Sequence, residues 1–155
     1  MALTLVSEKK NLKVVLLADD AVGNKDDDNY MSYLKTLNEE MLDLKGEPTR
    51  FVLRSTLTWN AKEMLRKRNI RYNPSEGQMD MDITYMTDLV RFSLIGVENP
   101  ESVPKEKQIT FKRDSDGYAS KELVNALDNI GQLTFLFFAI QGNMTEEDTD
   151  LVKKN

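Results

Sequence analysis

Apolar residues recur along this chain at two different spacings, and each spacing predicts a different kind of element. Between residues 29 and 45 they fall three, four, seven and eleven positions after Tyr30, which places them on one face of a helix. Asp27 or Asp28 would cap the start of this helix, and Gly46 would end it.

Two more segments carry a helical stripe. Residues 84–97 have apolar side chains at helical spacing, and Pro100 would stop this helix because proline cannot continue one. Ser120 would cap a further helix. Its inner face would carry Leu123, Val124 and Leu127.

The stretch TWNAKE, residues 58–63, predicts a helix start that gives the single tryptophan a structural role. Asn60 at the N-cap would place Glu63 at the third helical position, where each residue caps the other. Trp59 and Met64 would then pack together across the first turn as a hydrophobic staple. We therefore expect Trp59 in the core and not at a ligand site.

Alternation of apolar and polar residues predicts strands. Residues 12–18 and 51–58 are expected to pair, in antiparallel fashion, and residues 108–113 form a shorter alternating run. Residues 69–82 are mostly polar and are expected to form a long loop. The pattern as a whole predicts an α+β fold that is predominantly helical, with a small two- or three-stranded β element.

The chain has 155 residues, for which a single domain is the default. We expect one domain over residues 1–155, with residues 1–28 partly in loops and the core formed by residues 29–140. Residues 143–155 would form a short C-terminal helix, since Thr145 and the carboxylate three positions later resemble a capping box.

Composition narrows the possible chemistry. The sequence has no cysteine and no histidine, so a disulfide framework, a cysteine-ligated zinc site and a histidine-based catalyst are excluded. The net charge of −5 disfavours nucleic acid as the main partner, because binding to phosphates needs a basic surface. No apolar run is long enough to predict a membrane span, and the first residues do not resemble a signal peptide.

Acidic residues gather at two places. Asp80, Asp82 and Asp88 lie close together, and Asp114 and Asp116 belong to the stretch DSDG. A calcium loop needs a third oxygen ligand and a distant bidentate glutamate, and DSDG lacks both. We therefore expect a turn there and no metal site. Glycine-rich phosphate loops and a nucleophile elbow are also missing from the sequence.

Basic residues gather near Trp59 and Tyr72, over a stretch that also contains the predicted helix start. The group consists of Lys62, Arg66, Lys67, Arg68 and Arg71. A solvated helix face explains such a group most simply. If it binds a partner, an acidic helix of another protein or of a second copy fits the overall negative charge better than nucleic acid does.

The stretch LTFLFFAI, residues 133–140, is apolar nearly all round, which is typical of a helix that is covered on every side. The cover could come from its own domain or from another chain. The eight methionines in the sequence, with no site to explain them, favour adaptable apolar contacts.

Three stretches, taken in order, carry a resemblance to a known class of proteins. They are FVLRSTLTW (51–59), GVENPES (96–102) and GNMTEEDTDLVKKN (142–155). Over roughly residues 47–155 the chain is similar to small proteins of tailed bacteriophages that are encoded among the head and tail genes. Many of these proteins are tail assembly chaperones.

The resemblance implies a non-enzymatic role in bacteriophage morphogenesis, without a cofactor, exerted through protein–protein contacts in the host cytoplasm. The implied partners are the tape-measure protein, the tail-tube subunits or neighbouring virion subunits, and a homo-oligomer is possible, whereas nucleic acid and membrane are not expected. The implied contact residues form an apolar centre with an acidic rim. The centre would be Leu133, Phe135, Phe137, Phe138 and Ile140, and the rim Glu146, Glu147, Asp148 and Asp150.

Three alternatives stay open from the sequence. The first is a structural protein that remains in the virion as a head, connector or tail component. The second is a small enzyme or metal-binding protein that relies on carboxylates. The third is a phage-encoded inhibitor of a host protein.

Overall fold

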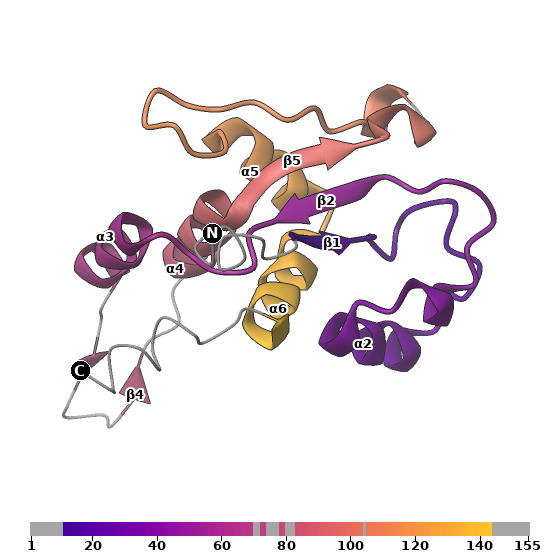
Figure 1. Cartoon of the computed structure of the whole chain (residues 1–155), viewed down its shortest axis with the longest axis horizontal. Coiled ribbons are helices and arrows are strands. Elements are labelled where there is room, and N and C mark those ends of the chain that lie inside the picture. Colours follow the sequence, from indigo (N-terminus) through magenta and orange to yellow (C-terminus); the bar gives the residue numbers. More distant parts are fainter. Residues whose placement is uncertain (1–10, 70–71, 74–77, 80–82, 104, 144–155) are drawn as a thin grey trace, which may run out of the picture.

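The computed structural model describes residues 11–69, 72–73, 78–79, 83–103 and 105–143 (Figure 1). Over this part of the chain, five α-helices surround a three-stranded antiparallel sheet, so the predicted α+β single domain is confirmed. The helices α2 (Asp27–Thr36) and α3 (Trp59–Asn69) lie at opposite ends of the molecule, and the sheet crosses between them (Figure 1).

The central strand of the sheet is β2 (Arg50–Leu53), with β1 (Leu12–Val14) on one side and β5 (Leu94–Glu98) on the other. Phe51 lies opposite Val14 on one neighbour and opposite Val97 on the other. The predicted antiparallel pairing of the first two strands is confirmed. Both strands are shorter than predicted, because β1 gives way to turns after Val14 and the register of β2 shifts next to its last residue.

The first predicted helix is two elements rather than one. Helix α2 (Asp27–Thr36) is capped by Asp26, whose carboxylate accepts from the amide of Asn29 at 2.9 Å, and it ends where Leu37 takes a left-handed conformation with φ of 57°. A 3₁₀ turn, η1 (Glu39–Leu42), follows. The prediction of one helix to residue 45 is wrong because the side chain of Asn38 caps this new turn, and such caps compete with a continuing helix.

A similar correction applies to the predicted helix over residues 84–97. Helix α4 (Ile83–Ser93) ends four residues earlier than predicted and passes directly into β5. Ser93 lies at the junction, where its carbonyl accepts from the amide of Arg54 at 2.8 Å. The residues after it favour a strand, since Ile95 and Val97 are β-branched and Gly96 is a poor helix former.

The segment over residues 69–82 contains more structure than the predicted loop. After α3 (Trp59–Asn69), the short strands β3 (Tyr72–Asn73) and β4 (Gln78–Met79) pair in antiparallel fashion. The prediction of a long polar loop is therefore wrong in part, because main-chain pairing needs no apolar side chains.

Residues 108–113 do not form the predicted strand. Two 3₁₀ turns, η2 (Pro100–Ser102) and η3 (Lys105–Lys107), precede them, and a single bridge joins Arg113 to Ala119. This bridge closes the predicted turn at DSDG.

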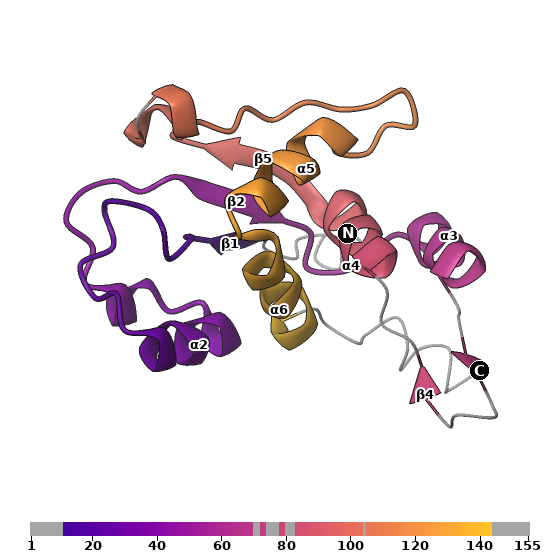
Figure 2. The ribbon, with the colours of Figure 1, turned by 180° about the vertical axis from the view of Figure 1, so that it is seen from behind.

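The last two described helices form the back of the core. Ser120 caps α5 (Lys121–Asn129) by accepting from the amide of Leu123 at 3.0 Å, as predicted. Helix α6 (Leu133–Asn143) follows at an angle of 109° and lies between α2 and α4 (Figure 2). Within the described residues no single helix has the length and apolar character of a membrane span. The bent pair α5 and α6 has that length and composition only when the two helices are taken together.

Candidate functional site

Helix α6, which carries the apolar residues of the expected interface, belongs to the core of its own domain. Leu133, Phe137 and Ile140 are each at most 2% exposed. Phe135 is half-buried, with its ring 4.9 Å from the ring of Tyr30 in an edge-to-face arrangement. Of the two covers that the sequence left open for this helix, its own domain is the one that the structure shows.

One residue of the expected apolar centre is not covered in this way. Phe138 on α6 is 38% exposed, so its side chain can still contact a partner. The acidic rim, Glu146, Glu147, Asp148 and Asp150, lies outside the described residues. The interface at the C-terminal segment therefore stays a prediction, and the search for a site extends to the rest of the surface.

Trp59, at the start of α3, is the most exposed large apolar side chain among the described residues, at 69%. The predictions that Trp59 lies in the core and that Asn60 caps the helix are wrong. The hydroxyl of Thr58 accepts from the amide of Ala61 at 3.1 Å, so the helix begins at Trp59, two residues earlier than predicted. This start turns Ala61 into the core and leaves Trp59 on the outer side of the first turn.

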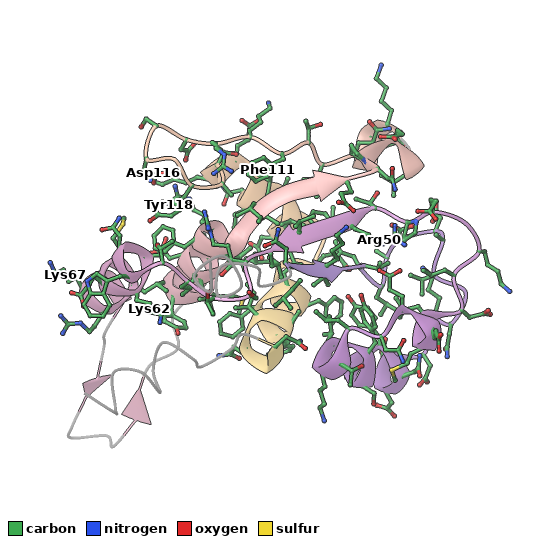
Figure 3. The ribbon with its side chains drawn as sticks, viewed as in Figure 1. Arg50, Lys62, Lys67, Phe111, Asp116 and Tyr118 are labelled. Carbon is green, nitrogen blue, oxygen red and sulfur yellow. The ribbon has the colours of Figure 1, made fainter. Side chains whose placement is uncertain are left out.

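Basic residues share the outer side of α3 with the tryptophan. Lys62 and Arg66 follow Trp59 by three and seven positions, a spacing that places all three on one face of the helix. We call these three residues the Trp59 face. The guanidinium of Arg66 pairs with Glu63 at 3.1 Å, and Lys67 adds a further charge at the end of the molecule (Figure 3).

A pocket of about 290 Å³ is lined by residues from parts of the chain that are far apart in the sequence. Its wall is largely apolar and includes one carboxylate, that of Asp19, which is 5% exposed. Ile130, in the turn between α5 and α6, stands on the wall and is 44% exposed. The lining residues are Leu16, Ala18, Asp19, Thr49, Phe51, Val103, Ile109 and Ile130.

Asp19 also fastens the loop that forms the pocket wall. One carboxylate oxygen accepts from the amide of Ala21 at 2.9 Å, and the other accepts from the amide of Thr49 at 2.8 Å. The ammonium of Lys25 lies nearby but donates to the main-chain oxygens of Leu17 and Asp19, not to the carboxylate. Among the described residues no cationic side chain forms an ion pair with Asp19.

The carboxylates of DSDG face a buried arginine. Arg91 on α4 is 1% exposed, and its Nη2 lies 2.6 Å from Asp116 and 3.5 Å from Asp114, while its Nε donates to the carbonyl of Ala119 at 2.8 Å. The ring of Tyr118 packs on Phe92, with centroids 4.5 Å apart, on the same side of the domain (Figure 3). These contacts give the two aspartates a structural role.

Burial works against ionisation of Asp116, but the groups around it work more strongly in favour. Burial alone would raise the pKa of this carboxyl. The hydrogen bonds from Arg91 and from the amide of Tyr118, with the charges of Arg91 and Lys121, outweigh burial and hold the pKa below its usual value. In the described part of the chain no group of three or more acidic residues is placed to hold a metal ion. Asp88 is buried on α4, and Asp80 and Asp82 lie outside the described residues.

No family model, curated protein sequence or solved structure matches the chain. The resemblance to phage morphogenesis proteins therefore stays a prediction from the order of the short motifs. Sequence reasoning found the basic residues of α3 but missed the exposure of Trp59 and the pocket beside Asp19. The exposure of Trp59 depends on where the helix begins, and the pocket depends on the fold.

Proposed function

We propose that this chain is a non-enzymatic bacteriophage morphogenesis protein of the tail assembly chaperone type, and that the Trp59 face of α3 is one of its contact surfaces. The observation that carries the contact surface is the 69% exposure of Trp59 in a domain whose other aromatic side chains are mostly packed.

An exposed tryptophan contributes little to the stability of its own domain. Buried in an interface, an aromatic side chain of this size covers roughly 150–250 Å². Tryptophan and arginine are also the residue types most enriched among those that dominate binding energy. The placement of Trp59 beside Arg66 on one helix face is therefore typical of a contact site for another protein.

The charges around Trp59 indicate what kind of partner fits. Lys62, Arg66 and Lys67 carry positive charge on the outer side of α3, and Glu63 offsets part of it. An acidic segment of a partner protein would be attracted to this face and oriented by it. A chain with a net charge of −5 gains less from a nucleic acid, so a protein partner is favoured.

The phage assignment is supported by where the motifs lie in the fold. FVLRSTLTW runs from β2 to the start of α3, and GVENPES runs from β5 into η2. The two stretches are neighbours in the sheet, since Phe51 lies opposite Val97. Thr49, just before the first stretch, donates its hydroxyl to the carbonyl of Asn99 at 2.8 Å. The two motifs thus form one continuous part of the fold.

Co-expression with the tape-measure protein of the same phage genome tests the proposal. A tail assembly chaperone should keep that protein soluble, and Trp59→Ala should reduce its soluble yield several-fold. Met31→Ala is the matched control, because Met31 is 38% exposed on α2 at the other end of the molecule. Equal yields with the two variants would contradict the contact surface, and no effect of the unmodified chain would contradict the chaperone role.

Mass spectrometry of purified particles separates the chaperone from a structural protein of the virion. A chaperone should be abundant during infection and missing from finished particles. Presence of the chain at a fixed number of copies per particle would instead establish the alternative that it is a head, connector or tail component.

A further inference from the structure

We propose that the pocket beside Asp19 is a binding site for a small organic ammonium ion, with a short apolar body in the pocket and a cationic head at the carboxylate. This inference does not depend on the phage assignment or on the Trp59 face, because it uses a different part of the surface.

The wall of the pocket is largely apolar. Leu16, Phe51 and Ile109 are buried apolar residues that present part of their surface to the pocket, and Ile130 forms an exposed apolar edge. Small-molecule sites combine such walls with a few polar groups that orient the ligand. The volume of about 290 Å³ is at the lower end of the range for such sites, which favours a small ligand.

The carboxylate of Asp19 places a buried acidic group on the pocket wall. A carboxylate that is 5% exposed is costly unless it is paired or hydrogen-bonded. The amides of Ala21 and Thr49 each occupy one position on the Asp19 oxygens, and a carboxylate can accept about four hydrogen bonds. Acceptor capacity therefore remains on a group that lines the pocket.

Among the described residues no cationic side chain pairs with the carboxylate of Asp19. Lys25, whose ammonium lies close to this loop, is held by the carbonyl oxygens of Leu17 and Asp19 at 2.6 and 2.5 Å. It leaves the carboxylate without an ion pair from the described residues. An ammonium head that enters with a ligand would supply the charge and the hydrogen-bond donors that Asp19 lacks. An anionic head would be repelled by the same carboxylate.

A matched series of three probes tests the site without changing the protein. The probes are n-hexylammonium, n-hexanol and hexanoate, which share the apolar body and differ in the charge of the head. Titrations followed by two-dimensional NMR of the backbone amides should show n-hexylammonium binding with a Kd on the order of 1 mM. The shifted signals should be those of Ala18, Ile109 and Ile130. Hexanoate should bind at least about tenfold more weakly, as expected for repulsion from a buried carboxylate.

Variants locate the binding in the pocket. Ala18→Trp should fill the pocket from its exposed edge and abolish the shifts, because Ala18 lines the pocket yet is itself exposed and its side chain is not part of the core. Asp19→Asn should reduce the preference for n-hexylammonium over n-hexanol to near unity. Asp20→Asn is the control, since it removes a neighbouring exposed carboxylate that does not line the pocket.

Three results would overturn the proposal. The first is equal affinity for the three probes, which would make the pocket an apolar site for uncharged groups such as the side chain of a partner. The second is no shift with n-hexylammonium at about ten times the expected Kd. The third is binding that survives Ala18→Trp, which would place it elsewhere. If Asp19→Asn prevents folding, the probe series and Ala18→Trp still decide the question.

Discussion

Tyr30 and Tyr33, one turn apart on α2, both form hydrogen bonds with the main chain of Val15. The hydroxyl of Tyr30 donates to the carbonyl of Val15 at 2.9 Å, and the amide of Val15 donates to the hydroxyl of Tyr33 at 3.0 Å. Both tyrosines are fully buried, with their rings 5.5 Å apart. Val15 follows β1 directly, so this pair of bonds fastens the end of the edge strand to the helix.

Removing either hydroxyl should destabilise the domain measurably. Tyr33→Phe would leave the buried amide of Val15 without its partner, and Tyr30→Phe would do the same to the carbonyl. An unsatisfied buried group costs about 1–3 kcal/mol, and we expect each variant to lose that much free energy of unfolding in urea titrations. Tyr118→Phe is the control and should change the value by about 0.5 kcal/mol or less, because its hydroxyl makes only a long contact of 3.4 Å with Asn60. Loss of the same size in all three variants would contradict the argument.

The same tyrosines predict a loss of stability at alkaline pH. Burial is the main cause that raises the pKa of Tyr33 to about 12. The hydrogen bond from the amide of Val15 and the charge of Arg50 oppose this rise, and the charge of Glu39 adds to it. Burial and the neighbouring Tyr33 raise the pKa of Tyr30 further above its usual value. An unfolded tyrosine ionises near pH 10, so the folded chain binds more protons than the unfolded chain above that pH.

We therefore expect a free energy of unfolding that is steady below about pH 10 and falls as the pH rises toward 12. Denaturation titrations at a series of pH values would measure it, with tyrosinate absorbance as a second readout. Full ionisation of all tyrosines near pH 10 in a chain that stays folded would rule out the buried arrangement.

Phe137 and Phe138 are neighbours on α6 that should respond very differently to truncation. Phe137 is 1% exposed and packs edge-to-face on Tyr85, with centroids 6.1 Å apart, whereas Phe138 is 38% exposed. Phe137→Ala should cost about 3–5 kcal/mol in unfolding free energy, because it leaves a cavity in the core. Phe138→Ala should cost roughly 1 kcal/mol or less. Thermal unfolding followed by circular dichroism would compare the two, and similar losses would show that α6 is not packed as described.

The pair of Arg91 and Asp116 predicts a loss of stability at acid pH. The pKa of Asp116 is held below its usual value, so the folded chain keeps this carboxylate ionised at a pH where the unfolded chain is protonated. The resulting stability is present above about pH 4 and is lost as the pH falls through the lower pKa of the folded state.

Asp116→Asn should therefore flatten the dependence of unfolding free energy on pH below about pH 4. At neutral pH the variant should be less stable by about 1–3 kcal/mol, since it leaves the buried guanidinium of Arg91 with a weaker partner. Asp128→Asn, on the exposed side of α5, is the control. An unchanged pH dependence in Asp116→Asn would mean that other carboxylates dominate acid unfolding.

The elements that were predicted correctly are those whose signal is local. The cap at Ser120 and the turn at DSDG each depend on neighbouring residues, and the structure has both. The apolar stretch 133–140 lies within a single helix, as its composition predicts. The boundary between α4 and β5 was missed because apolar residues at helical spacing continue past Ser93, and the pairing with β2 decides the outcome.

The surface features could not be predicted in the same way. The pocket takes its wall from separate parts of the chain, to which Asp19, Phe51, Ile109 and Ile130 belong, and no local pattern connects them. The exposure of Trp59 depends on whether Thr58 or Asn60 caps α3, and both residue types are good caps. With the cap at Thr58, Trp59 is the first residue of the helix and lies on the outer side of its first turn; with the cap at Asn60 it would precede the helix.

The direct passage from α4 into β5 fixes the length of the chain at that point. Because no spare residue lies between Ser93 and Leu94, an inserted or deleted residue has nowhere to be absorbed. It would move every later side chain of β5 to the opposite face of the sheet, exchanging inward and outward positions. We expect the fold to tolerate an inserted residue or a peptide tag in the exposed turn around Gly46. We expect it not to tolerate either at the junction of α4 and β5.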